Sequence, residues 1–186
     1  MRAWCVTVEI HVDIRGRTHI GLVRSNNEDS YLIDTESKVA IVSDGMGGHD
    51  AGEVASAITV ESFGKVIRAR LGKASSVEDV LTILSNSIGL ANQETFLAAK
   101  SSAAGRSMGA TAVCGCLWGE TFAVAHVGDS RAYLVQNGMI TRLTKDHTVV
   151  QELVDGGFID EEAARFHPQK NIITRYVGSE KGYAPS

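Results

Sequence analysis

The sequence predicts an α+β fold with mostly antiparallel sheets. Strand-like and helix-like patterns are segregated along the chain: four strand segments come first, two long amphipathic helices follow, and a second run of strands comes after them. The second run contains Asn137-Gly138 between two apolar stretches, and this dipeptide favours a tight hairpin between antiparallel strands. A parallel sheet would instead alternate strands with helices.

The first run of strands is predicted from the alternation of apolar and polar residues with a period of two. Such alternation buries one face of a sheet and leaves the other face more polar. The segments with this pattern are 5–12, 17–23, 29–34 and 38–43.

Two long helices are predicted next. Asp50 followed by Glu53 predicts a capping box for the first helix, and Ser75 with Glu78 predicts the same cap for the second, which we expect to reach about Ala99. Apolar residues in the first helix recur every three or four positions and predict one buried stripe. This stripe consists of Ala57, Val60, Phe63, Ile67 and Leu71.

The second run of strands is followed by two short helices. We expect the first helix at about 148–155, closed by Gly156-Gly157, and the second from Asp160 to Phe166. The strand segments before them are 110–118, 121–127, 131–136 and 139–143.

Length and composition are typical of one globular domain. With 186 residues, two prolines and no low-complexity run, the sequence shows no sign of a linker, so we expect 1–186 to form a single domain. The formal net charge of −4 disfavours a general nucleic-acid-binding surface. No apolar run approaches the roughly 20 residues of a membrane span, so we expect no membrane partner.

The cysteines favour a reducing compartment. Cys114 and Cys116 would point to the same face of one strand, a poor geometry for a disulfide, and Cys5 leaves the number odd. We expect them to be small buried side chains. Because Glu9 and Asp13 interrupt the apolar character of the N-terminal stretch, it does not resemble a secretory signal, and we expect a cytoplasmic protein.

The stretch VSDGMGGHDAGE, residues 42–53, places Asp44 where an apolar strand ends and follows it with four glycines in eight residues. A dinucleotide-binding turn fits poorly, because Asp50 stands where its third glycine should fall and Asp44 would repel a pyrophosphate. A site for a hard cation fits better, since a carboxylate and a nearby backbone carbonyl are oxygen ligands of the kind that Mg²⁺ and Mn²⁺ favour. On this stretch alone, a simple turn-capping role for Asp44 is equally consistent.

Other charged residues favour the cation site. Arg24 precedes Glu28 and Asp29 where another strand begins, and Asp129 stands at a turn between two strands. Each of these residues alone is more typical of a turn or a surface ion pair. Together they indicate a metal-bound phosphate, with the arginine holding the phosphate oxygens and the cations neutralising the remaining charge.

These motifs resemble those of the PPM-type (type 2C) metal-dependent protein serine/threonine phosphatases, in particular the compact bacterial members. The resemblance runs from about residue 16 to the end, in the family order. The matching motifs are VRSNNEDS at 23–30, VSDGMGGHDAGEVAS at 42–56, GATAV at 109–113, HVGDSRAYL at 126–134, LTKDHTVVQELVDGG at 143–157 and HPQKNIITRYVG at 167–178.

The resemblance implies an α-β-β-α sandwich, in which two antiparallel sheets pack face to face with helices outside. It also implies a centre of two Mn²⁺ or Mg²⁺ ions, with a weaker third ion in bacterial relatives. Asp44 resembles the carboxylate that bridges two ions, Gly45 the residue that offers its carbonyl to one of them, and Asp129 a ligand of the third.

The implied activity is hydrolysis of phosphoserine and phosphothreonine by a metal-activated water, without a phosphoenzyme. Arg24 resembles the residue that binds the substrate phosphate, and Glu28 and Asp29 resemble the acids that hold metal-bound waters. The partners would be phosphorylated proteins that are substrates of a serine/threonine kinase.

Two departures from the family pattern bear on activity. Many members have histidine, a candidate general acid, where this chain has Met46; His49 lies three residues on. Family catalytic domains also continue with further strands and two more metal-ligating aspartates, whereas Asp146, Asp155 and Asp160 are not in matching contexts here. We therefore expect an incomplete domain with negligible activity on its own.

The alternative function is that of a catalytically impaired relative that binds phosphoproteins or regulates a kinase pathway. The retained residues favour an enzyme ancestry, because a non-catalytic relative has no chemical need for all of them, whereas the missing end of the domain favours the impaired relative for this chain. They are Arg24, Glu28, Asp29, Asp44 and Gly45.

Overall fold

The centre of the molecule is an antiparallel sheet with the strand order β1-β2-β4-β5. The computed structural model describes residues 11–47, 51–101 and 108–180. A short strand, β3, pairs with β2 in the same register as β4 does, so that both halves of β2 have a partner. The strands are β1 (Asp29–Asp34), β2 (Val39–Met46), β3 (Gly109–Ala110), β4 (Ala112–Trp118) and β5 (Thr121–Val127).

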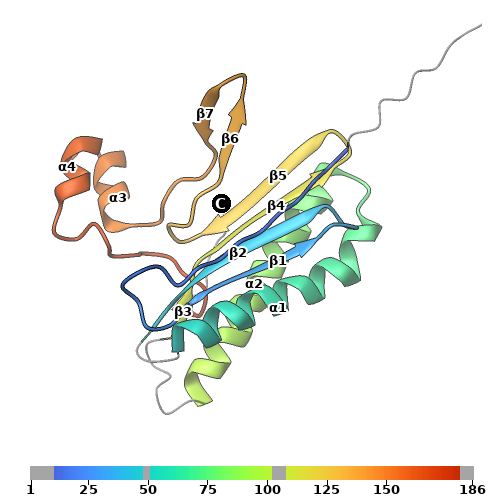
Figure 1. The fold of residues 1–186 in the computed structure, drawn as a ribbon, viewed down its shortest axis with the longest axis horizontal. Helices are drawn as coiled ribbons and strands as arrows, with labels where there is room; N and C mark the ends of the chain where they lie inside the picture. The colour runs from blue at the N-terminus through green and yellow to red at the C-terminus, as the bar shows by residue number, and fades with distance from the viewer. Residues whose placement is uncertain (1–10, 48–50, 102–107, 181–186) are drawn as a thin grey trace, which may run out of the picture.

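Two long helices pack against each other and cover one face of this sheet (Figure 1). They are α1 (Ala51–Arg70) and α2 (Val77–Ser101), joined by the 3₁₀ turn η1 (Leu71–Lys73). The core lies between the helices and the sheet, where burying a large apolar side chain contributes roughly 1.5–3 kcal/mol. Its largest fully buried apolar side chains are Phe63, Ile41, Ile67, Leu84, Ile88, Val39, Val80, Val127 and Val177.

The opposite face of the sheet is more open. Along β2, Val39, Ile41 and Ser43 are buried, whereas Val42 between them is 48% exposed. Tyr31 and Phe122 on the neighbouring strands are exposed as well. The period-two alternation that predicted these strands therefore reflects one covered face.

A second sheet consists, in the described residues, of the two-stranded hairpin β6 (Tyr133–Gln136) and β7 (Met139–Arg142). It extends away from β5 (Figure 1). Asn137 and Gly138 form its turn with φ angles of 52° and 76°, both in the left-handed region, as the predicted turn type requires. The predicted α+β fold with antiparallel sheets flanked by helices is confirmed.

Two short helices follow the hairpin, as predicted. The helices are α3 (Val149–Asp155) and α4 (Glu161–Phe166), and the side chains of Thr148 and Asp160 cap their N-termini. The chain then returns to the sheet, where Val177 forms an antiparallel bridge with Ala110. No helix in the described part of the chain is both long and apolar enough to cross a membrane.

The strand predicted at 17–23 is wrong. This segment is irregular, it turns at Gly21, and the side chains of Leu22 and Val23 are almost fully exposed. Among the described residues, no neighbouring strand pairs with this segment, and a strand needs such a partner for its backbone hydrogen bonds. Most of the strand predicted at 5–12 lies outside the described residues, and residues 11 and 12 are irregular.

The cap of α2 is displaced by one residue from the prediction. Ser76 and Asp79, not Ser75 and Glu78, form the reciprocal pair: the Asp79 amide donates to Ser76 Oγ at 3.1 Å, and the Ser76 amide donates to Asp79 Oδ2 at 3.2 Å. The predicted cap of α1 at Asp50 lies outside the described residues.

Candidate metal and phosphate site

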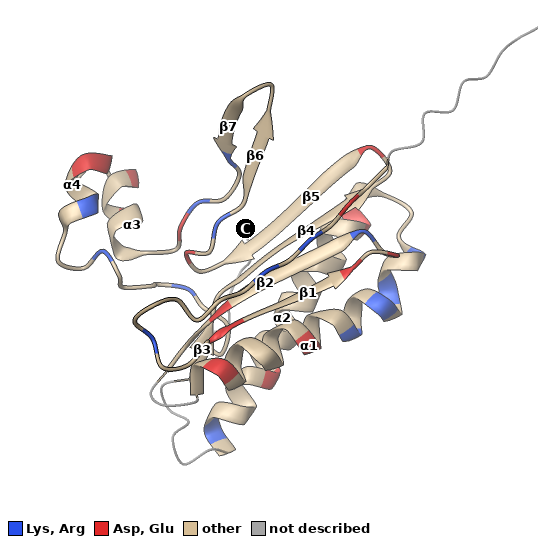
Figure 2. Cartoon of the chain, viewed as in Figure 1, with Lys and Arg blue, Asp and Glu red and all other residues tan. Residues whose placement is uncertain are grey.

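A cavity of about 690 Å³ opens at the end of the sheet where β1 begins and β2 ends. Acidic residues gather at this end of the two strands, beside β3 (Figure 2). All six residues that the sequence singled out line the cavity, although they come from separate segments of the chain. They are Arg24, Glu28, Asp29, Asp44, Gly45 and Asp129.

Thr111 holds the backbone of Asp44 in place. It lies opposite Asp29 in the β1–β2 register. Its amide donates to Thr111 Oγ1 at 3.0 Å, and its carbonyl accepts from the Thr111 amide at 2.8 Å. Thr111 Oγ1 also contacts Ser130 Oγ at 2.6 Å, so one threonine connects Asp44 with the turn that carries Asp129.

The carboxylates of the cavity change the pKa of Asp44. Burial raises the pKa of Asp44, and the negative charges of Asp29, Asp129 and Glu28 raise it further, while Arg24 lowers it. Burial likewise raises the pKa of Asp129. Crowded carboxylates of this kind are stabilised by a cation between them.

The donors suit a hard divalent ion in chemistry but not in number. Carboxylate oxygens and a nearby backbone carbonyl are ligands that Mg²⁺ and Mn²⁺ prefer. Within residues 11–47, 51–101 and 108–180, however, no three His, Cys, Asp or Glu side chains are grouped closely enough to hold one ion. The described residues therefore fit part of a metal centre, in which waters or further ligands would fill the remaining positions.

Gly45 is required by close packing of the backbone. Its amide donates to the Glu28 carbonyl at 3.0 Å. A Cβ atom at Gly45 would lie 1.9 Å from the carbonyl oxygen of Gly52, in the first turn of α1, and 2.8 Å from the carbonyl oxygen of Glu28. A glycine here lets the end of β2, the start of β1 and the start of α1 meet beside the cavity.

Met46 stands where the resemblance places a histidine that is a candidate general acid. Met46 itself lines the cavity, and His49 lies outside the described residues. His19, which the sequence did not single out, lines the cavity as well. The Gly21 amide donates to its Nδ1 at 2.9 Å, so the neutral ring carries its proton on Nε2.

Asp129 and Asn171 line both this cavity and a second one of about 660 Å³, which extends toward α3 and α4. The second cavity is lined by several cationic side chains, among them Arg165 and Lys170. Thr111 and Asn171 lie within the motifs GATAV and HPQKNIIT of the resemblance, but neither residue type indicates a site without the tertiary structure.

The loop before α3 contains a buried histidine with an unusual titration. Burial lowers the pKa of His147 to about 4, and the nearby His126 and Arg175 add to this effect. The folded protein therefore takes up this proton less readily than the unfolded chain does.

We expect this histidine to contribute stability that is present above pH 6.5 and lost as the pH falls toward 4. The loss from this one group reaches up to about 3 kcal/mol. Urea unfolding of the wild type and His147→Asn between pH 7 and 4 measures it: the wild type should lose more stability than the variant. Equal losses would show that His147 does not titrate in this way.

Comparisons with known proteins give the following similarities. Residues 16–153 match the family model described as protein phosphatase 2C. The serine/threonine phosphatase Stp of Listeria innocua is 38% identical over 167 residues, a match that covers 88% of this chain and 66% of that protein. The chain thus spans just under two thirds of the length of this relative.

Solved structures show the same similarity. The serine/threonine phosphatase of S. agalactiae matches with a TM-score of 0.81 and 36% identity, covering 89% of this chain and 69% of the other. The catalytic domain of the phosphatase PstP, solved in complex with two manganese ions, matches with a TM-score of 0.73 and 32% identity, covering 89% and 66%.

Proposed function

Because the chain belongs to the protein phosphatase 2C family, whose members depend on metal ions, we propose that it hydrolyses phosphoserine and phosphothreonine in proteins at a Mn²⁺ or Mg²⁺ centre. The observation that carries this proposal is the convergence of Arg24, Asp44 and Asp129, from three distant segments, on one cavity. The partners would be proteins phosphorylated by a serine/threonine kinase.

In this proposal Asp44, the carbonyl of Gly45 and Asp129 would hold the ions: two ions in the main centre and a third at Asp129. When bound, the ions supply an activated water and positive charge beside the phosphoryl group. Glu28 and Asp29 accept hydrogen bonds from waters in the cavity and so orient them. Glu28, just before β1, accepts from the Gly45 amide, and Asp29, the first residue of β1, lies opposite Asp44; these places support this role.

Arg24 would bind the phosphate of the substrate. Arg24 lines the same cavity as Asp44, and its positive charge lowers the pKa of that carboxylate; both observations support this role. A planar guanidinium donates two parallel hydrogen bonds to a phosphate and orients it for attack.

Replacing Arg24 by alanine should raise KM for p-nitrophenyl phosphate more than it lowers kcat. The lost charge-assisted contact is worth roughly 1.5–3 kcal/mol, which corresponds to about a 10- to 150-fold loss of kcat/KM. Steady-state kinetics in Mn²⁺ measure it on an extended protein, in which the part of the Listeria innocua phosphatase that follows the matched region is joined to the chain. Arg17→Ala, outside the cavity lining, is the matched control. An Arg24→Ala variant with the kinetics of the control would exclude this arginine from phosphate binding.

A second candidate function is a phosphoprotein-binding module without turnover. It is favoured by the absence of any group of three acidic, histidine or cysteine ligands in the part of the chain that the structure describes. The two functions differ in one experiment, in which a phosphothreonine peptide is titrated into the extended protein with Mn²⁺. Binding that requires Arg24 without release of phosphate favours the module, and release of phosphate favours the enzyme.

We also propose a single domain in a reducing, cytoplasmic compartment. The support for a reducing compartment is that Cys114 and Cys116 are free and buried in β4, and that burial raises the pKa of Cys114 to about 12. Such thiols act as small core side chains.

A further inference from the structure

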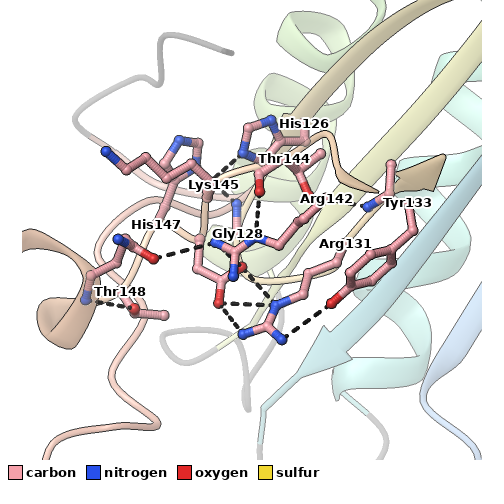
Figure 3. A network of polar contacts seen from close by, with 12 residues as sticks. His126, Gly128, Arg131, Tyr133, Arg142, Thr144, Lys145, His147 and Thr148 are labelled. Atoms are coloured by element: carbon pink, nitrogen blue, oxygen red, sulfur yellow. Dashed lines mark hydrogen bonds and ion pairs between the residues drawn. The ribbon is translucent and has the colours of Figure 1, made fainter. Parts of the chain in front are cut away.

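The turn that carries Asp129 is held by contacts with a segment that lies more than a dozen residues further along the chain. On one side of Asp129, the Gly128 amide donates to His147 Nδ1 at 3.1 Å, and the His147 amide donates to the Gly128 carbonyl at 3.0 Å. On the other side, Arg131 donates to both carboxylate oxygens of Asp146 at 2.6–3.1 Å. Figure 3 shows these contacts as one network.

The imidazole of His147 is fixed in position and in tautomer. Because its Nδ1 accepts a hydrogen bond, the neutral ring carries its proton on Nε2. Its ring stacks on that of His126, with 4.7 Å between ring centroids and 9° between the planes, and both residues are buried. His126 Nε2 donates in turn to the carbonyl of Lys145 at 2.6 Å, which holds the loop of His147 against β5.

The residue that His147 holds is conformationally special. Gly128 has a φ angle of 98°, a conformation that favours glycine, and a Cβ atom there would lie 2.6 Å from Thr111 Cγ2. Glycine also leaves the backbone of the turn free to adopt other conformations. The two hydrogen bonds with His147 restrain both the amide and the carbonyl of Gly128, and the next residue along the chain is Asp129.

We propose that His147 is the positioning residue of Asp129. Its ring nitrogen and its backbone amide fix the Gly128 conformation from which the Asp129 carboxylate projects into the cavity. The proposal rests on the metal site proposed above, because it assigns to His147 the orientation of a metal-ligating carboxylate. Residues that orient ligands in this way are worth roughly 10- to 100-fold in metal affinity.

Paired substitutions separate this role from simple packing. In His147→Asn, the side-chain oxygen takes the place of Nδ1 and can accept from Gly128, whereas in His147→Gln the amide reaches the place of Nε2 instead. The same pair at His167, whose Nδ1 accepts from the Gln169 amide at 3.1 Å in another part of the chain, is the matched control. Two readouts are needed. One is the Mn²⁺ affinity of the extended protein by calorimetry, and the other is hydrogen exchange of the Gly128 amide together with the Asp129 carboxyl ¹³C shift in metal-free protein.

We expect His147→Asn to keep Mn²⁺ affinity within threefold and to protect the Gly128 amide, and His147→Gln to lose at least tenfold in affinity and that protection. The His167 pair should leave both readouts unchanged. Equal behaviour of the two His147 variants, or a folded His147→Asn that loses Gly128 protection, would overturn the proposal. If the wild type binds no Mn²⁺, the metal site fails, but the metal-free readouts still decide whether His147 positions Asp129.

Discussion

Replacing Asp44 by asparagine is expected to weaken Mn²⁺ binding by well over tenfold. The substitution keeps the shape of the side chain and the backbone contacts with Thr111, but it removes the central negative charge of the cavity. Mg²⁺ and Mn²⁺ give up water reluctantly and bind weakly where carboxylates are few, so the loss of this ligand has a large effect.

The same substitution should not destabilise the metal-free protein. The Asp44 carboxylate is partly buried and repelled by Asp29, Asp129 and Glu28, so its removal relieves an unfavourable interaction. Calorimetry of the extended protein with Mn²⁺ and thermal unfolding without metal measure the two effects. Asp34→Asn, at the other end of β1, is the matched control. Unchanged Mn²⁺ affinity in Asp44→Asn would remove Asp44 from the metal site.

Gly45→Ala is expected to have the largest effect on stability. The added methyl group would meet the Gly52 carbonyl oxygen at 1.9 Å and the Glu28 carbonyl oxygen at 2.8 Å. The strand end that carries it is held by the hydrogen bond from Gly45 to Glu28 and by its pairing with β3. Overpacking usually costs about 1–3 kcal/mol, and a collision between two backbone segments belongs at or above the upper end of that range.

Gly72→Ala is the matched control for this prediction, because a Cβ atom at Gly72 meets nothing within 4 Å and its φ angle is not in the left-handed region. Urea unfolding should give Gly72→Ala a free energy of unfolding close to that of the wild type. A Gly45→Ala protein as stable as the Gly72→Ala protein would show that the start of α1 does not pack against Gly45 as described.

Local sequence signals predicted much of the fold. The period-two alternation at 29–34 and the pair Asn137-Gly138 correspond to β1 and the β6–β7 turn, because both depend on neighbours in the chain. The same alternation at 17–23 predicted a strand that does not exist, since pairing depends on a partner that periodicity does not reveal.

The candidate site, like the fold, was predicted only in part. Charged residues at strand ends, such as Asp44 and Asp129, are visible in the sequence, and the structure brings them to one cavity. Thr111 and His147 were not foreseen as part of the site, because a threonine in a strand and a histidine in a loop acquire their roles only through contacts with distant residues. Gly45 was predicted to offer its carbonyl to a metal ion, and the structure adds a packing reason for a glycine there that concerns α1.

The central claim is that the cavity around Asp44 and Arg24 hydrolyses phosphate esters of serine and threonine with the help of Mn²⁺ or Mg²⁺. The most direct test measures phosphate release from a phosphothreonine peptide by two proteins: the 186-residue chain, and the same chain extended by the part of the Listeria innocua phosphatase that follows the matched region.

We predict that the extended protein releases phosphate in the presence of Mn²⁺. A chelator, Asp44→Asn or Arg24→Ala should suppress this release. We predict negligible release by the 186-residue chain, because its described residues hold no group of three ligands. An extended protein that folds but releases no phosphate in Mn²⁺, or whose activity survives Asp44→Asn, would contradict the claim.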